Sequence, residues 1–321
     1  MRHASTLEQL PLGADTQIAA VDKARKSLGS IILGKDAEIS LALACLLARG
    51  HLLIEDLPGL GKTILAQSLA SVLGLSFQRI QFTSDLLPAD IIGVSIFQQQ
   101  QGEFKFQPGP IFSQLVLADE VNRATPKAQS ALLEAMEEQQ VSIDGQTYSM
   151  PTPYFVVATQ NPSDQIGTFP LPESQLDRFL MRIALGYPNE ESERALITGT
   201  DRRQMLSRIA PTLNAETLMQ LQETVAKIHM TEPLVDYVQA LVRFTRESPD
   251  IETGMSPRGS LALVAAARAH ALIKHHSGVF PDDVQAVFAS VAGHRLKPAS
   301  NSAYRTPADL SRHVLDSVAI P

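Results

Sequence analysis

The sequence predicts an α/β fold, in which an αβα core built on a parallel five-stranded sheet precedes a C-terminal domain made only of helices. Short apolar runs alternate with helical patterns from about residue 36 to 187, which is typical of a parallel sheet covered by helices. After Pro188 the strand pattern stops and only helical patterns continue. We therefore place a domain boundary there and expect domains 1–188 and 189–321.

The core elements are expected in a regular order. Apolar runs predict strands at 51–55, 77–82, 114–118, 154–159 and 181–185. After an N-terminal helix, patterns of apolar residues predict further helices at 36–49, 61–74, 126–139 and 172–180.

Two insertions interrupt this order, and each predicts a hairpin at the rim of the sheet. In the insertion at 91–107, the segments IIGVSIF and EFKFQ flank a short glutamine run. In the one at 140–151, Asp144-Gly145 suits a two-residue type I′ turn. The apolar residues of the first insertion favour either contact with a partner or pore, or packing on their own domain.

The C-terminal part predicts helices at 190–199, 214–227, 232–247, 257–276 and 281–294. The last begins at Pro281, followed by two aspartates, where proline and acidic residues are favoured.

Composition excludes several classes of protein. Of the 321 residues, 44% are hydrophobic and 19% are charged, which excludes a disordered or collagen-like chain. The longest apolar run, Leu41–Ala48, is far shorter than the ~18 residues that a membrane span requires. The first residues contain no apolar segment typical of a secretory signal, so we expect a cytoplasmic protein without a membrane span.

Charge and cysteine content narrow the choice further. The single cysteine, Cys45, excludes an internal disulfide and a multi-cysteine zinc site. The net charge is −7, and acidic residues outnumber basic ones on both sides of the expected boundary. Nucleic acid is therefore an unlikely main partner.

The strongest motif is a strand, a glycine-rich loop and a helix start, which together are typical of a phosphate-binding loop. Gly59 and Gly61 allow backbone N–H groups to surround a phosphate at the helix N-terminus. Lys62 is expected to reach the β/γ oxygens of ATP, and the Thr63 hydroxyl to bind Mg²⁺. The alternative is a glycine-rich helix start with an exposed lysine, because Asp56 stands where the pattern expects glycine.

Polar residues follow two of the apolar strands. Asp119 and Glu120 come directly after one run, at the strand end where ligands bind in open α/β sheets. We expect Asp119 to hold Mg²⁺ and Glu120 to polarise the attacking water. Asn161 follows another run and either contacts the γ-phosphate or the water, or merely begins an Asn-Pro turn.

Two arginines have both a functional and a structural interpretation. Arg178, in Leu-Asp-Arg-Phe-Leu, forms either a surface ion pair with Asp177 or an arginine finger inserted into a neighbouring subunit. Arg258 follows Ser256 and Pro257, which suit a helix start. It is either a solvated side chain of the first helical turn or a phosphate ligand.

These motifs occur in the order found in AAA+ ATPases. The segments 55–63, 118–124, 129–138 and 171–179 resemble the MoxR family of that class, and the resemblance covers roughly residues 30–295. It implies a P-loop NTPase core with an all-helical lid, in which 91–107 is a helix-2 insert and 140–151 a pre-sensor-1 hairpin.

The resemblance also implies roles for single residues. Lys62 and Thr63 match Walker A, Asp119 and Glu120 match Walker B, Asn161 matches sensor 1, Arg178 matches the arginine finger and Arg258 matches sensor 2. ATP is then bound by Pro58, Gly59, Leu60, Gly61, Lys62, Thr63, Ile64 and Arg258, Mg²⁺ by Thr63 and Asp119, and catalysis rests on Lys62, Glu120, Asn161 and Arg178.

Family members are thought to form hexameric rings and to act as chaperones that remodel or activate partner proteins, often metalloenzymes. They often work with a von Willebrand factor A domain. Because this chain has no Asp-x-Ser-x-Ser motif, such a domain would come from a separate protein. Two alternatives stay open: an AAA+ subunit of a nucleic-acid motor, and a binding scaffold that ATP switches without turnover.

Overall fold

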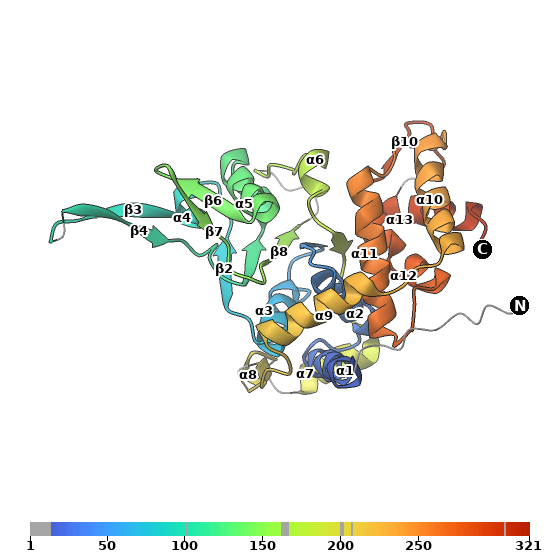
Figure 1. The fold of residues 1–321 in the computed structure, drawn as a ribbon, viewed down its shortest axis with the longest axis horizontal. Helices are drawn as coiled ribbons and strands as arrows, with labels where there is room; N and C mark the ends of the chain where they lie inside the picture. The colour runs from blue at the N-terminus through green and yellow to red at the C-terminus, as the bar shows by residue number, and fades with distance from the viewer. Residues whose placement is uncertain (1–13, 101, 162–166, 200–201, 207, 305) are drawn as a thin grey trace, which may run out of the picture.

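The central element is a five-stranded parallel sheet with the strand order β2-β5-β8-β1-β9 (Figure 1). The computed structural model describes residues 14–100, 102–161, 167–199, 202–206, 208–304 and 306–321. The strands are β1 (Leu52–Glu55), β2 (Phe77–Gln81), β5 (Leu115–Asp119), β8 (Phe155–Gln160) and β9 (Met181–Ile183). The predicted sheet is therefore confirmed.

Alternate residues of the strands point to two separate hydrophobic clusters. Leu52 and Ile54 of β1 belong to the cluster that includes α1, α2 and α3. Leu53 belongs to the other cluster, which α5 covers. Because successive side chains of a strand point to opposite faces, this division places helices on both sides of the sheet, as in an αβα core.

The core helices lie around this sheet. They are α1 (Ala14–Ile31), α2 (Asp36–Leu47), α3 (Lys62–Leu73), α4 (Pro88–Ile92), α5 (Pro126–Glu138), α6 (Glu173–Leu176) and the short 3-10 helix η1 (Val121–Arg123). The helix predicted at 172–180 is shorter than expected. The chain leaves α6 because Phe179 is fully buried and the Leu180 N–H donates to the His51 carbonyl, which leads into β9.

Two antiparallel hairpins stand at the rim. The first pairs β3 (Gly93–Gln98) with β4 (Glu103–Pro108) and projects from the body of the protein (Figure 1). It begins after residue 91, where we expected it to start, because Ile91 is fully buried in α4. The second pairs β6 (Gln140–Ile143) with β7 (Gln146–Ser149) through Asp144 and Gly145, which both have positive φ.

The C-terminal part is mainly helical, as predicted, but it also contains elements that the sequence did not predict. Its helices are α7 (Glu190–Thr198), α8 (Arg202–Leu206), α9 (Ala215–Lys227), α10 (Glu232–Glu247), α11 (Pro257–Ile273), α12 (Pro281–Ala292) and α13 (Pro307–Ser317). The elements not predicted are α8, α13 and a small ribbon of β10 (Ile251–Thr253) and β11 (Lys297–Pro298). Helix α11 ends before the predicted residue 276, since His275 adopts a left-handed conformation with φ 60°.

The helical part packs on one face of the core. Residues of α9, α11 and α12 share a hydrophobic cluster with α2 and α3, and the Gln222 amide donates to the Leu46 carbonyl at 2.8 Å. The boundary between residues 188 and 189 remains our proposal. Across the residues described, none of the helices combines the length and the hydropathy needed to cross a membrane.

Candidate functional site

The glycine-rich loop lies between β1 and α3, at the carboxyl end of the sheet. Gly59 and Gly61 have φ values of +85° and +90°, and nothing lies within 4 Å of a Cβ built at either position. These glycines are therefore required by the backbone conformation and not by lack of space. Helix α3 begins at Lys62, so its free N–H groups face the space above the loop.

Asp56, which stands where the phosphate-loop pattern expects glycine, connects this loop to the core by hydrogen bonds. Its carboxylate accepts hydrogen bonds from the Leu57 N–H at 2.8 Å and from the Gly186 N–H at 2.6 Å. Gly186 belongs to the segment that follows β9. The acid thus ties the beginning of the loop to the end of the neighbouring strand.

The Lys62 side chain is buried and lies across the loop. Its ammonium group donates to the Asn161 Oδ1 at 2.7 Å and also contacts the carbonyl oxygen of Asp56. Burial lowers the pKa of Lys62, while the carboxylates of Asp56, Asp119 and Glu120 act in the opposite direction. Together with Glu55, these acids favour the charged form of Lys62, which is the form that a phosphate requires.

Asp119 ends β5 and is buried. One carboxylate oxygen accepts a hydrogen bond from the Thr159 hydroxyl at 2.5 Å. The other accepts from Arg79, with Nε at 2.9 Å and Nη2 at 2.6 Å. Both carboxylate oxygens of Asp119 thus accept hydrogen bonds from neighbouring side chains.

Glu120 has an unusual backbone conformation and a fully engaged carboxylate. Its φ is +57°, and its N–H donates to the Thr159 hydroxyl at 2.9 Å. The Asn161 amide donates to one carboxylate oxygen at 3.0 Å. Gln81 and Arg123 donate to the other, at 3.1 and 2.9 Å. The side chain is thus held at the mouth of the loop by three neighbours.

A cavity of about 270 Å³ brings these groups together. It is lined by Pro58, Gly59, Gly61, Lys62, Thr63, Ile64, Asp119, Glu120 and Asn161. Of the predicted binding residues in the loop, Leu60 alone is missing from this lining. Among the residues described, no three His, Cys, Asp or Glu side chains form a self-sufficient metal cluster. A hydroxyl and a carboxylate fit Mg²⁺ that takes its other ligands from phosphate and water.

Arg178 and Arg258 lie elsewhere. Both contact Glu137 near the end of α5, Arg178 at 2.8 Å and Arg258 at 2.5 Å. The parallel register aligns Met181 with Leu52, so Arg178 precedes the amino end of β9 while the glycine loop follows the carboxyl end of β1. At ~3.3 Å per residue, a four-residue strand separates these two edges by about 13 Å.

Sequence reasoning missed four residues of the site region, namely Arg79, Gln81, Thr159 and Glu137. The first three lie near the carboxyl ends of β2 and β8, next to the acids on β5. The sequence shows these three polar residues near the ends of two strands. Their closeness to Asp119 and Glu120 becomes visible only once the order of the strands in the sheet is known.

Comparison with known proteins agrees with this geometry. Residues 51–181 match the model of the ATPase family associated with various cellular activities, and residues 243–313 match the AAA lid domain. The chain is 42% identical to the uncharacterized protein YeaC of Bacillus subtilis, over 93% of this chain and 94% of that protein. It is 40% identical to chaperone MoxR1 of Mycobacterium tuberculosis, over 99% and 88% of the two chains.

A solved structure is also similar. The crystal structure of a proposed ATPase from Cytophaga hutchinsonii superposes with a TM-score of 0.86 and 33% sequence identity, covering 96% of this chain and 97% of that one.

Proposed function

Because the chain belongs to the MoxR family of AAA+ ATPases, we propose that it binds ATP with Mg²⁺ at the glycine loop and hydrolyses it. The observation that supports this most directly is the single cavity shared by Lys62, Thr63, Asp119, Glu120 and Asn161. It combines a helix N-terminus, a buried ammonium and two acids, which is the set that phosphoryl transfer requires.

The side chains would divide the chemistry as follows. Lys62 neutralises phosphoryl oxygens, and Thr63 and Asp119 hold Mg²⁺, which stabilises the charge on the leaving phosphate groups. Glu120 orients the attacking water, with the Asn161 amide beside it. The contacts of Lys62 with Asn161 and of Asp119 with Arg79 must open as the phosphates and the metal enter.

Arg178 would complete the site of a neighbouring copy. Because it precedes the amino end of β9, it is separated from the cavity of its own chain by the length of the strands. We therefore propose a homo-oligomer, a hexameric ring as in the family resemblance, in which Arg178 and Arg258 of one copy face the phosphates of the next.

The biological role follows from the relatives and is part of the proposal. A relative named as a chaperone, 40% identical over nearly the whole chain, supports ATP-driven remodelling or activation of a client protein complex. A separately encoded von Willebrand factor A domain protein would assist, and the location expected is the cytoplasm. A nucleic-acid motor is less well supported, because β6–β7 contains no Lys or Arg and β3–β4 contains only Lys105.

The test compares three proteins in a steady-state phosphate-release assay with and without Mg²⁺. Glu120→Gln should bind a fluorescent ATP analogue like the parent but lower kcat by about 100-fold or more, because positioned acid–base groups contribute ~10²–10⁴-fold. Lys62→Ala should lose binding. An unchanged rate in Glu120→Gln would contradict the role of Glu120. Binding of ATP without any turnover by the parent protein would favour the scaffold.

A further inference from the structure

The loop that carries Arg178 is held by the helical part of the chain. Asp177, the preceding residue, accepts hydrogen bonds from Arg295 Nε at 2.6 Å and from the Ser256 hydroxyl at 3.0 Å. Arg295 follows α12, and Ser256 is the N-cap of α11. A single carboxylate therefore connects two elements of the lid to the core loop.

Arg295 also binds the backbone of that loop. Its guanidinium donates to the carbonyl oxygens of Asp177 at 3.1 Å, Phe179 at 2.8 Å and Leu180 at 3.2 Å. These carbonyls lie on both sides of Arg178. The Arg295 side chain is only 4% exposed, so it is a buried charge that depends on these acceptors. The planar fork of five N–H donors suits such a set, whereas a lysine ammonium does not.

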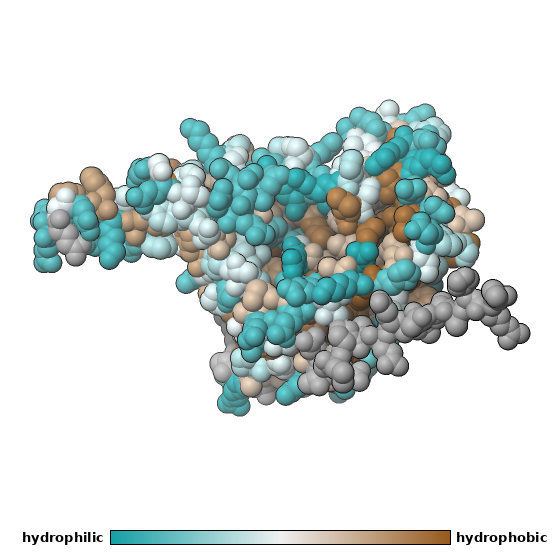
Figure 2. Space-filling model, in the orientation of Figure 1, coloured by the Kyte–Doolittle hydropathy of each residue, from teal (hydrophilic) through white to brown (hydrophobic). Residues whose placement is uncertain are grey.

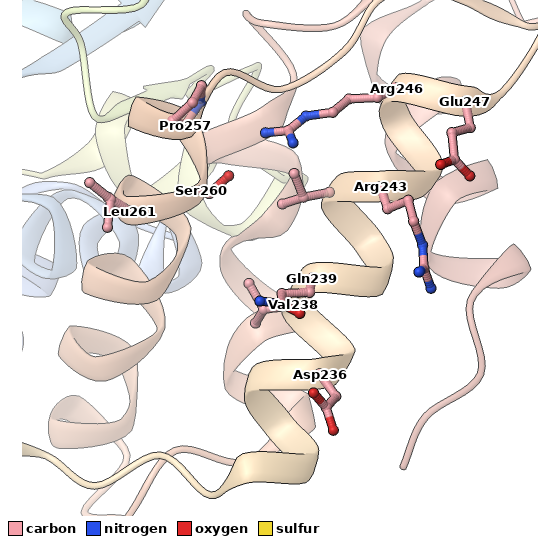
Figure 3. A pocket seen from close by; sticks show the side chains of 10 residues that line it. Asp236, Val238, Gln239, Arg243, Arg246, Glu247, Pro257, Ser260 and Leu261 are labelled. Carbon is pink, nitrogen blue, oxygen red and sulfur yellow. The ribbon is translucent and has the colours of Figure 1, made fainter.

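Helix α11 of the lid, which carries Arg258, packs closely against the Arg295 side chain. A Cβ at Gly259 would lie 3.0 Å from Cδ and 3.2 Å from Nε of Arg295, so a larger residue there would have to displace the Arg295 side chain slightly. Arg246 of α10 donates to the Met255 carbonyl at 2.9 Å and fixes the start of α11 from the other side. A groove between α10 and α11 is lined by Val242, Arg246 and Ser260, among others, and Figure 3 shows the Arg246 side chain pointing across it towards Pro257. Figure 2 shows apolar surface over this region.

The result is that two arginines from different parts of the chain meet at one carboxylate. Arg178 from the core loop and Arg258 from α11 bind the two oxygens of Glu137. Both are partly exposed, at 28% and 48%, so they remain available to a partner. Within this group of three side chains, Glu137 supplies one negative charge for two positive ones.

We infer that Arg295 and Asp177 are positioning residues that hold Arg178 and Arg258 as one unit, which acts on the phosphates of ATP bound by a second copy of this chain. Gly259 leaves the room that Arg295 needs, and Glu137 holds the unit until a more strongly charged triphosphate replaces it. Neither positioning residue touches nucleotide. This inference rests on the proposed function, since it names further residues on which the same reaction depends.

The first experiment separates binding from turnover in Gly259→Ala and Arg295→Lys. Both variants keep every residue of the ATP cavity, so the affinity for a fluorescent ATP analogue should stay within about twofold. The kcat should fall by about 10- to 100-fold, because small displacements of a positioned group have effects of this size. Arg312→Lys is the matched control, because Arg312 forms an exposed ion pair on α13 of the same lid, and its kcat should be unchanged.

The second experiment tests the action on another copy. Mixing Gly259→Ala chains with Glu120→Gln chains should raise the rate above that of either alone, because the second chain supplies a correctly held arginine pair. A Glu120→Gln/Arg178→Ala chain should give no rise. A parallel loss of ATP affinity, an unchanged kcat, or equal rates in the two mixtures would overturn the inference. A parent protein that does not hydrolyse ATP would instead refute the proposed function.

Discussion

Replacing Thr159 by valine isolates one hydroxyl that serves both acids of the site. Thr159 is fully buried in β8. Its hydroxyl donates to the Asp119 carboxylate at 2.5 Å and accepts from the Glu120 N–H at 2.9 Å. The same oxygen thus fixes Asp119, the proposed metal ligand, and the backbone with positive φ that presents Glu120. Valine fills nearly the same volume, so the change removes the two hydrogen bonds and little else.

The expected loss of stability follows from the groups left without a partner. An N–H and a carboxylate oxygen that lose their partner in this site each cost ~1–3 kcal/mol, so the free energy of unfolding should fall by about 2–6 kcal/mol. The unfolding entropy is ~2.1 cal/mol/K per residue, or about 0.7 kcal/mol/K for a chain of 321 residues. The melting temperature should therefore fall by about 3–9 °C if the chain unfolds as one unit.

Thermal and urea denaturation measure this change, and Thr159→Ser is the matched control. Serine keeps the hydroxyl and loses one buried methyl group, which costs ~1 kcal/mol. The serine variant should melt within about 2 °C of the parent and retain most of its ATPase activity, whereas the valine variant should lose most of it. A valine variant as stable as the parent, or more stable than the serine variant, would refute this account of the site.

Two further predictions concern the metal and the pH. Arg79→Ala removes from Asp119 a half-exposed ion pair worth ~0.5–1 kcal/mol. The Mg²⁺ concentration for half-maximal ATP binding should therefore fall about two- to fivefold. A Mg²⁺ titration in which the variant needs more Mg²⁺ than the parent would contradict this. Burial lowers the pKa of His51 to about 4 in the folded chain. Between about pH 6.5 and pH 4, the unfolded chain therefore binds a proton at His51 that the folded chain does not bind. Stability should fall between pH 6.5 and 4 by up to ~3 kcal/mol, and it should fall less steeply in His51→Gln. Urea unfolding curves with the same midpoint at pH 7 and pH 5 would disprove this.

The sequence was informative where function depends on contiguous residues. The glycine loop, the acids after β5 and the five apolar strands are each visible in one short segment, and the structure places Lys62, Asp119, Glu120 and Asn161 around one cavity. Their catalytic roles remain predictions. The positions of the side chains, by contrast, follow from the parallel sheet that the alternating pattern predicts.

What the sequence could not provide are contacts between distant segments. Thr159 donates a hydrogen bond to Asp119 because β8 lies beside β5. Arg295 donates to Asp177, which lies 118 residues earlier in the chain. Nothing local marks either pair. Short elements were missed for a related reason, since β11 has two residues and α8 has five, too few for a periodic pattern. Helix α13 is long enough for a periodic pattern, but only a few of its residues, such as Leu310 and Val314, are apolar and buried.

The two edges of the sheet also determine how activity should depend on the number of copies. Because the Lys62 cavity and Arg178 lie at opposite edges, copies that complete one another must join by unlike faces, and such contacts give either open rows or closed circles. A row of n copies completes n − 1 cavities, whereas a circle completes all n. On the proposed function, the rate per chain would rise as (n − 1)/n with row length and fall towards zero when dilution separates the copies.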